Sequence, residues 1–180
     1  MTILTIDFEA SCLPRHGRSF PIEVGIAGPA MVRSWLIQPG EDWADWDWTD
    51  EAQALHGLSR DRIAREGQPA QAVIGELAAL VAGHRVVADS VLDQYWLETL
   101  AMAARAPVPF AIDHVAMLLD ERHIGESAIM AAVAFADANH PARHRAACDA
   151  QWLQAVVAHA LGDVNGEPIM PRLYMAESLC

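Results

Sequence analysis

Short runs of apolar and β-branched residues dominate the start of the chain, and apolar residues at helical spacing dominate the rest. Four runs are typical of strands, at 2–9, 22–27, 31–37 and 85–88, and a shorter apolar run occupies 110–112. Gly28 and Pro29 separate the second run from the third, a turn signal that indicates antiparallel pairing. The pattern therefore predicts a three-stranded meander followed by further strands.

Helices are predicted where apolar residues recur every three or four positions and form one buried face. They lie near 49–56, 59–65, 69–82, 92–104, 125–137 and 145–161. Strands that come first, followed by helices alternating with further strands, predict an α/β sandwich in which helices flank a mixed sheet. The chain has 180 residues, 53% of them hydrophobic, so we expect one domain over 1–162 and an irregular C-terminal tail over 163–180.

Composition limits the partners of the protein. No apolar run approaches the roughly 18 to 20 residues that span a bilayer, and no signal segment is recognisable, so we expect a cytoplasmic protein without a membrane partner. The formal net charge is −12, with only 12 basic residues, whereas a protein that grips long nucleic acid normally recruits many. This charge disfavours a processive duplex binder and suits a site that concentrates divalent cations and handles few nucleotides.

Two carboxylates lie at the end of the first predicted strand. Alternate side chains of a strand share a face, so Asp7 and Glu9 project together from a segment that is otherwise apolar. An ordinary strand end that enters solvent has the same composition. The pair therefore indicates a site only if other polar residues join it.

Two predicted helices each carry a further carboxylate on the buried side. The apolar stripe of the last helix extends backward by four residues onto Asp149, and that of the helix at 92–104 extends backward onto Asp93. A carboxylate in a first helical turn could instead interact with the helix N-terminus, which is worth up to about 1 kcal/mol. Two such positions, together with Asp7 and Glu9, favour a shared acidic site.

Four clustered carboxylates repel one another unless cations neutralise them. Oxygen ligands of this kind suit Mg²⁺ or Mn²⁺ rather than zinc, and they make a two-metal phosphodiester hydrolase the reaction class to consider. His144 precedes Asp149 by five residues, so on a continuous helix it would point about 140° away from the aspartate. We expect it on the loop before the helix, where it could accept a proton from a water, although most of the 8 histidines must be ordinary surface residues.

Three segments resemble, in order, the exonuclease motifs of the DEDDh (DnaQ-like) 3′–5′ exonuclease family. They are Asp7-Phe8-Glu9-Ala10-Ser11, Asp93-Gln94-Tyr95-Trp96-Leu97 and His144-Arg145-Ala146-Ala147-Cys148-Asp149-Ala150. The resemblance runs from about residue 3 to 161. Ile22-Glu23-Val24-Gly25 is similar to the second strand of that family, and His56-Gly57-Leu58-Ser59 to its His-Gly-Ile-Thr segment.

The resemblance implies a ribonuclease H-like fold, with a mixed five-stranded sheet flanked by helices, and two Mg²⁺ or Mn²⁺ ions. In that family scheme Asp7, Glu9 and Asp149 hold one metal. Asp7, helped by Asp93 through water, holds the other, and His144 is the general base. The implied reaction removes nucleoside 5′-monophosphates from nucleic acid 3′ ends, and the analogy also implies a homodimer, since many relatives are dimers.

One departure from the family pattern and one similarity to it bear on the substrate. Many family members have His-Asn shortly before the second motif, where this chain has Ala88-Asp89, which adds a carboxylate. The opening Asp-Phe-Glu-Ala-Ser is similar to the Asp-Phe-Glu-Ala-Thr of relatives that trim RNA 3′ ends. We therefore expect single-stranded or short nucleic acid, with RNA favoured. Four arginines adjoin the first and third motifs and are candidates for phosphate contacts, namely Arg15, Arg18, Arg143 and Arg145.

Other interpretations of these residues remain. The loop at 43–48 carries three tryptophans that could stack on unpaired bases, but its acidic residues would repel phosphates, which favours tryptophans that anchor the loop on the fold. The fold could also serve a catalytically silent module that binds nucleic acid or protein, although all five catalytic positions hold competent residues. A ribonuclease H-like endonuclease is a further alternative, in which the pair His144 and Asp149 would have no obvious role.

Overall fold

A mixed five-stranded sheet forms the centre of residues 2–162, the part of the chain that the computed structural model describes. Its strands are β1 (Ile3–Ala10), β2 (Pro21–Gly28), β3 (Met31–Leu36), β4 (Arg85–Ala88) and β5 (Ile112–His114). The order across the sheet is β3-β2-β1-β4-β5. The first three strands form an antiparallel meander, and β4 and β5 add to β1 in parallel. The predicted mixed sheet and meander are confirmed.

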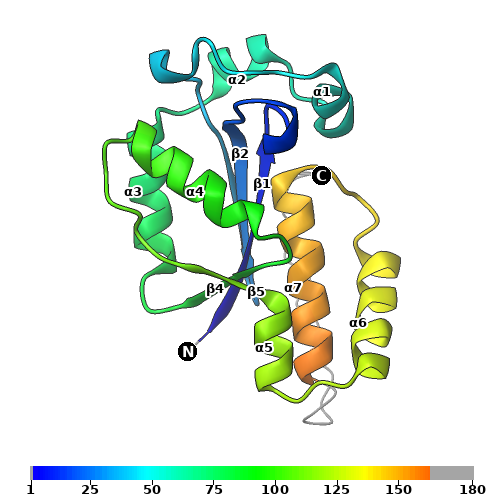
Figure 1. The fold of residues 1–180 in the computed structure, drawn as a ribbon. Coiled ribbons are helices and arrows are strands. Elements are labelled where there is room, and N and C mark those ends of the chain that lie inside the picture. The colour runs from blue at the N-terminus through cyan, green and yellow to red at the C-terminus, as the bar shows by residue number, and fades with distance from the viewer. Residues whose placement is uncertain (1, 163–180) are drawn as a thin grey trace.

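Helices cover both faces of the sheet (Figure 1). They are α1 (Asp50–His56), α2 (Arg60–Glu66), α3 (Ala70–Val81), α4 (Leu92–Ala103), α5 (Val115–Glu121), α6 (Glu126–Asn139) and α7 (Ala146–Gly162). Helices α3 and α4 lie on one side of the sheet and α5, α6 and α7 on the other, while α1 and α2 lie beyond one end of the strands. Short 3₁₀ turns occupy Pro14–His16 and Glu41–Trp43.

Strand β1 separates the two layers because its side chains alternate. Leu4, Ile6 and Phe8 are buried in the core beneath α3 and α4. Thr5, Asp7 and Glu9 project from the other face, where the Thr5 hydroxyl donates a hydrogen bond of 2.6 Å to the carbonyl of Ala150 in α7. The carboxylates at the end of β1 therefore face the last helix.

The predicted buried faces of α4 and α7 are confirmed. Leu97, Leu100, Ala101 and Ala104 are buried along α4, and Leu153, Val156, Val157 and Ala160 are buried along α7. Each stripe leads back to an aspartate in the first part of its helix, Asp93 in α4 and Asp149 in α7. The predicted positions of both aspartates, at the start of a buried helix face, are confirmed.

A glycine allows α7 to lie directly on β2. A Cβ atom on Gly25 would stand 2.2 Å from the backbone carbon and oxygen of Ala146 and 2.5 Å from the nitrogen of Ala147. Such distances are far inside van der Waals contact, so no larger residue fits without moving the helix. Because Gly25 pairs with Asp7 across the sheet, the start of α7 is brought beside the acidic end of β1.

Two predictions differ from the structure around β5. The strand covers 112–114 rather than the apolar run at 110–112, and the following helix α5 was not predicted. Asp113 and His114 have low strand propensity and pair with β4 because of tertiary position. Helix α5 has only 7 residues, too few for a clear period, and begins where the His114 side chain accepts a hydrogen bond from the Ala116 N–H.

The tryptophan loop is part of the core. Trp43 is buried and stacks on Phe20 with ring centroids 5.3 Å apart, and Trp46 and Trp48 pack against the same cluster. The indole N–H of Trp48 donates to the side-chain oxygen of Gln53 at 3.0 Å. The interpretation that these residues anchor the loop is confirmed. The predicted irregular tail, 163–180, lies outside the described residues.

Candidate active site

Asp7 and Glu9 lie where the parallel part of the sheet ends. Strand β4 pairs with β1 only as far as Thr5, so the edge of β1 beyond that residue is open to the segment that follows β4. Open α/β sheets commonly bind ligands at the carboxyl ends of their strands, beside the helices that leave them. Asp7 and Glu9 occupy that position.

Helix α7 brings a third carboxylate to the same place. Oxygen atoms of Asp7, Glu9 and Asp149 lie within 4.8 Å of one another, a separation that a single cation can bridge. All three side chains are partly buried. The structure thus unites three of the predicted site residues from the two ends of the described chain.

Asp93 reaches the site from α4 and is 1% exposed. Its Oδ1 accepts a hydrogen bond of 3.1 Å from the backbone N–H of Phe8, on the edge of β1 that β4 leaves free. Its Oδ2 is buried and has no hydrogen-bond partner among the described residues. Buried polar atoms in native proteins are almost always satisfied, so this oxygen is a natural ligand for a cation or an ordered water.

Burial and mutual repulsion raise the pKa values of this cluster. The pKa of Glu9 is raised to about 8, first by burial and then by the charge of Asp149. The pKa of Asp93 is also raised to about 8, by burial and by the charge of Asp89. For Asp7 the pKa lies well above its usual value because of burial, with Asp93 the strongest charged neighbour. The extra carboxylate of the Ala88-Asp89 pair therefore acts on the site.

These shifts predict how the stability of the metal-free protein depends on pH. A carboxyl whose pKa is raised on folding holds its proton more tightly in the folded state, so its contribution is lost as pH rises through the folded value. The pKa of His56 is lowered to about 4, mainly by burial, and this histidine acts in the opposite sense below about pH 6.5. We therefore expect the melting temperature of protein treated with a chelator to fall between about pH 6.5 and 8.

Differential scanning fluorimetry across that range, with and without Mn²⁺, measures the effect. Bound cations should largely remove the fall because they neutralise the ionised carboxylates. Asp93→Asn should make the melting temperature of the metal-free protein depend less on pH, because the amide does not ionise. A metal-free melting temperature that rises steadily from pH 6.5 to 8 would contradict the raised pKa values of Glu9 and Asp93.

His144 lies on the loop before α7, as predicted. Its backbone is in the left-handed region with φ of 64°, and its N–H donates a hydrogen bond of 2.6 Å to Oδ2 of Asp149. The side chain is exposed. The backbone of His144 is thus tied to the carboxylate cluster, while the catalytic role of its imidazole stays a prediction.

Two arginines beside His144 have specific partners. Arg143 bonds to Oδ1 of Asp149 and lies over the ring of Trp152, 4.2 Å from the centroid. Arg145 forms a two-pronged pair with the carboxylate of Glu23, at 2.9 Å and 2.7 Å. Arg145 is therefore a structural partner of Glu23, and its role as a phosphate contact stays a prediction.

Glu23 is the residue of this region whose importance was not predicted. It is 1% exposed, and besides Arg145 it accepts a hydrogen bond of 3.2 Å from the backbone N–H of Ala146. The segment Ile22-Glu23-Val24-Gly25 had indicated only a family-like strand. A charged residue inside an apolar run is the sequence signal, since buried glutamates need a partner.

Solved exonuclease structures share this architecture. A full-length 3′-exonuclease matches with a TM-score of 0.67 at 14% identity, covering 92% of this chain and 61% of its own. A second 3′-exonuclease structure concerns 3′-end specific recognition of histone mRNA stem-loop. It matches with a TM-score of 0.69 at 14% identity, and the match covers 90% of this chain and 64% of that one. E. coli exonuclease I in complex with a dA16 oligonucleotide matches with a TM-score of 0.66 at 12% identity. That match covers 90% of this chain and 41% of the exonuclease I chain. The chain shares the ribonuclease H-like fold of these solved structures.

The ribonuclease H-like fold confirms the resemblance at the level of structure. The sequence matches no protein-family model and no curated protein. The chain spans between 41% and 64% of the length of the three solved chains above. On this fold, the acidic cluster of Asp7, Glu9 and Asp149 is consistent with metal binding.

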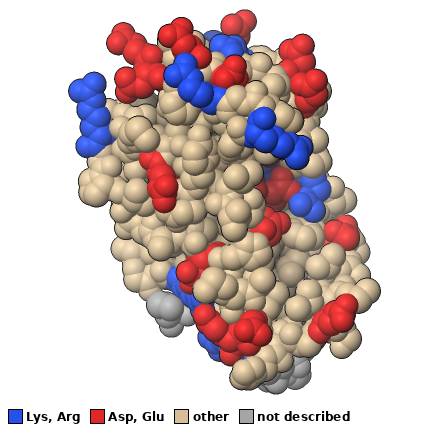
Figure 2. Space-filling model, in the orientation of Figure 1, with Lys and Arg blue, Asp and Glu red and all other residues tan. Residues whose placement is uncertain are grey.

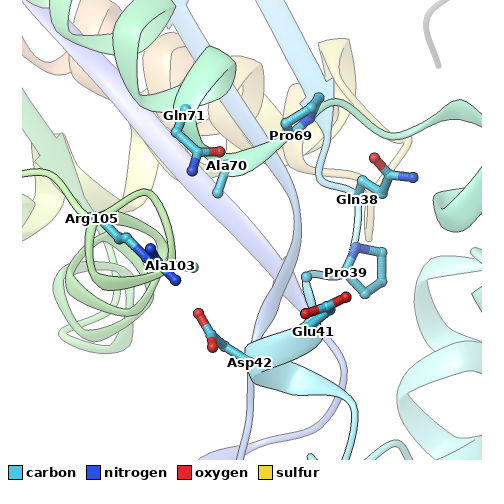
Figure 3. Close-up of a pocket in the computed structure, with 10 residues that line it drawn as sticks. Gln38, Pro39, Glu41, Asp42, Pro69, Ala70, Gln71, Ala103 and Arg105 are labelled. Carbon is cyan, nitrogen blue, oxygen red and sulfur yellow. The ribbon is translucent and has the colours of Figure 1, made fainter.

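A separate hollow lies between the end of β3, the start of α3 and the end of α4 (Figure 3). Its volume is about 290 Å³, and Glu41, Asp42 and Arg105 are among its lining residues. The carboxylates described above are not part of its lining.

Within residues 2–162, no helix is both long enough and apolar enough to cross a lipid bilayer.

Proposed function

We propose that the chain is a metal-dependent 3′–5′ exonuclease that hydrolyses phosphodiester bonds of single-stranded or short nucleic acid to nucleoside 5′-monophosphates. One observation carries the proposal. On a fold shared with 3′-exonucleases, oxygens of Asp7, Glu9 and Asp149 lie within 4.8 Å of one another, beside a buried Asp93 oxygen without a partner.

The donor set fits two Mg²⁺ or Mn²⁺ ions. The ligands are all oxygen atoms, which these hard cations prefer, and the raised pKa values of Glu9 and Asp93 show a cluster that favours neutralisation. Asp7, Glu9 and Asp149 would hold one ion, and Asp7 with Asp93 the other. When bound, the ions would stabilise charge on the phosphodiester transition state and lower the pKa of the attacking water.

His144 would accept the proton of the attacking water. Its exposed side chain lies on the loop before α7, where water can reach it, and imidazole is the side chain most often used as a general base. The hydrogen bond from its N–H to Asp149 keeps the loop against the carboxylate cluster. The water oxygen would form a new bond to phosphorus as the bond between phosphorus and the 3′ oxygen of the preceding nucleotide breaks. That oxygen would take up a proton from solvent and stay on the shortened strand, while the terminal nucleoside 5′-monophosphate is released.

We expect His144→Asn to lower the rate constant of hydrolysis by about 10² to 10⁴-fold, the usual contribution of a general base. Asparagine is the appropriate replacement because it tolerates the positive φ of this position and keeps the N–H donor to Asp149. The affinity for Mn²⁺, measured by calorimetry, should stay near that of the wild type. An unchanged rate and an unchanged acid limb of the pH profile would assign the base to another group.

The distribution of charge supports a short substrate. All 12 basic residues of the sequence are arginines, and several are held by carboxylates, among them Arg62, Arg85 and Arg145. On the face shown in Figure 2 the blue side chains are scattered among red ones and form no continuous band. A long phosphate backbone needs such a band, so single-stranded 3′ ends of a few nucleotides suit this surface better.

The solved structures of similar fold were obtained with both kinds of nucleic acid, a histone mRNA stem-loop and a dA16 oligonucleotide. Fold similarity therefore does not choose between RNA and DNA. The similarity of Asp7-Phe8-Glu9-Ala10-Ser11 to RNA-trimming relatives favours RNA.

An end-labelled substrate tests the proposal directly. Short RNA, single-stranded DNA and duplex DNA of equal length, each labelled at the 5′ end, are incubated with Mg²⁺ or Mn²⁺ and resolved on a gel. An exonuclease gives a ladder that shortens from the 3′ end, and we expect it to be fastest on the single-stranded RNA. Internal cuts would indicate an endonuclease, and intact substrate at all metal concentrations would indicate a binding module.

A further inference from the structure

The start of α7 is held on β2 by one buried carboxylate. Glu23 accepts three hydrogen bonds, two from the Arg145 guanidinium and one from the Ala146 N–H. Ala146 begins α7, so Glu23 both caps the helix and pairs with the residue before it. Both oxygens of this buried carboxylate have hydrogen-bond donors, which offset the cost of removing its charge from water.

The cross-strand register places this anchor next to the acidic cluster. Glu23 pairs with Glu9, and Gly25 pairs with Asp7, in the ladder between β2 and β1. Alternate residues share a face, so Glu23 and Gly25 lie on the side of β2 that α7 covers. The same two residues that pair with Glu9 and Asp7 therefore determine where α7 begins.

Helix α7 in turn carries the rest of the site. Asp149 lies in its first part, and the His144 N–H is bonded to Asp149. Any displacement at Ala146 moves both residues relative to β1. The pair of Glu23 and Arg145 therefore links β2 to the start of α7 through opposite charges.

We infer that Glu23 and Arg145 are positioning residues, which hold Asp149 and His144 over Asp7 and Glu9 at the separation that metal binding and catalysis need. The inference rests on the proposed function. Neither residue touches the substrate in this scheme. Partners that orient metal ligands in this way typically contribute about 10- to 100-fold to metal affinity or activity.

Three variants of the pair separate positioning from simple stabilisation. Glu23→Ala removes all three hydrogen bonds, and Arg145→Ala removes two. Glu23→Gln can keep an oxygen for the Ala146 N–H and Arg145 Nε, and it loses only the bond from Nη2. The matched control is Asp113→Ala, which breaks a pair with Arg85 on β4 at 2.7 Å, outside the acidic cluster.

The measurements are the Mn²⁺ affinity by calorimetry, the melting temperature, and kcat and KM on the single-stranded substrate. We expect Glu23→Ala to weaken Mn²⁺ binding by about 10- to 100-fold. The factor by which it lowers kcat should be larger than the factor by which it changes KM. Glu23→Gln should be intermediate. Asp113→Ala should lower the melting temperature while its Mn²⁺ affinity and kcat stay near those of the wild type.

Wild-type Mn²⁺ affinity and kcat in folded Glu23→Ala would overturn the inference. If Glu23→Ala does not fold, wild-type Mn²⁺ affinity and kcat in Glu23→Gln would overturn the inference instead. A loss of Mn²⁺ affinity in Asp113→Ala equal to that in the Glu23 variant would also overturn the inference. Failure of the proposed function looks different, because wild-type protein would then bind Mn²⁺ without hydrolysing any substrate. In that case the comparison of Mn²⁺ affinities still tests the positioning role.

Discussion

Asp7→Asn is expected to lower the rate of hydrolysis by about 10³-fold or more while the protein remains folded. Asp7 is the carboxylate assigned to both ions, and each metal contributes several kcal/mol of transition-state stabilisation, at about 1.4 kcal/mol per factor of ten. Steady-state rates on the end-labelled substrate measure the loss. Asp120→Asn, on the exposed side of α5, is the matched control and should keep the wild-type rate.

Stability distinguishes loss of the site from loss of the fold. The pKa of Asp7 is raised by burial and by neighbouring carboxylates, so its ionised form is unfavourable in the metal-free protein. The amide of Asp7→Asn removes that repulsion, and the metal-free melting temperature at pH 7.5 should equal or exceed that of the wild type. Mn²⁺ should raise the melting temperature of the wild type and much less that of the variant. Wild-type turnover by a purified Asp7→Asn preparation would show that the site has been assigned wrongly.

Gly25→Ala is the second substitution for which we expect a large effect, and it acts without touching any titratable group. Its Cβ would stand 2.2 Å from backbone atoms of Ala146, so the start of α7 must move away from β2. Forcing an extra methyl group into a packed core typically costs about 1 to 3 kcal/mol. A displacement of about 1 Å in a catalytic group can cost roughly 10²-fold in rate, so activity should fall further than stability suggests.

Gly75→Ala is the control for this substitution. Gly75 lies within α3, and no atom stands within 4 Å of the position that its Cβ would take. Alanine in a helix interior is more favourable than glycine by about 0.5 to 1 kcal/mol, so this variant should be slightly more stable and fully active. Thermal melts and rates of both variants give the comparison. A Gly25→Ala protein with wild-type stability and rate would mean that α7 does not depend on this close approach.

Local patterns were sufficient to predict most of the acidic site. Strand alternation put Asp7 and Glu9 on one face, and helical periodicity placed Asp93 and Asp149 on buried sides because each continues an apolar stripe. These signals depend on neighbours a few residues away. The same is true of the meander, whose turn at Gly28 and Pro29 lies between two clear strands.

Features that depend on distant partners could not be predicted in this way. Glu23 and Arg145 are 122 residues apart, and nothing near either residue indicates the other. Strand β5 exists because β4 offers it an edge, and its own residues Asp113 and His114 do not favour a strand. The left-handed backbone of His144 accompanies its hydrogen bond to Asp149, five residues later, and no residue next to His144 indicated this conformation.

The hydrogen bond from Thr5 to Ala150, which joins residues 145 positions apart, has a consequence for how the protein matures. Closing so long a loop costs conformational entropy, and the acidic cluster exists only when the loop is closed. A partly folded chain in which α7 has not docked would hold Asp7 and Glu9 without Asp149. Cation affinity is therefore a property of the finished tertiary structure, and ion binding should report on global unfolding rather than on the fraying of any single element.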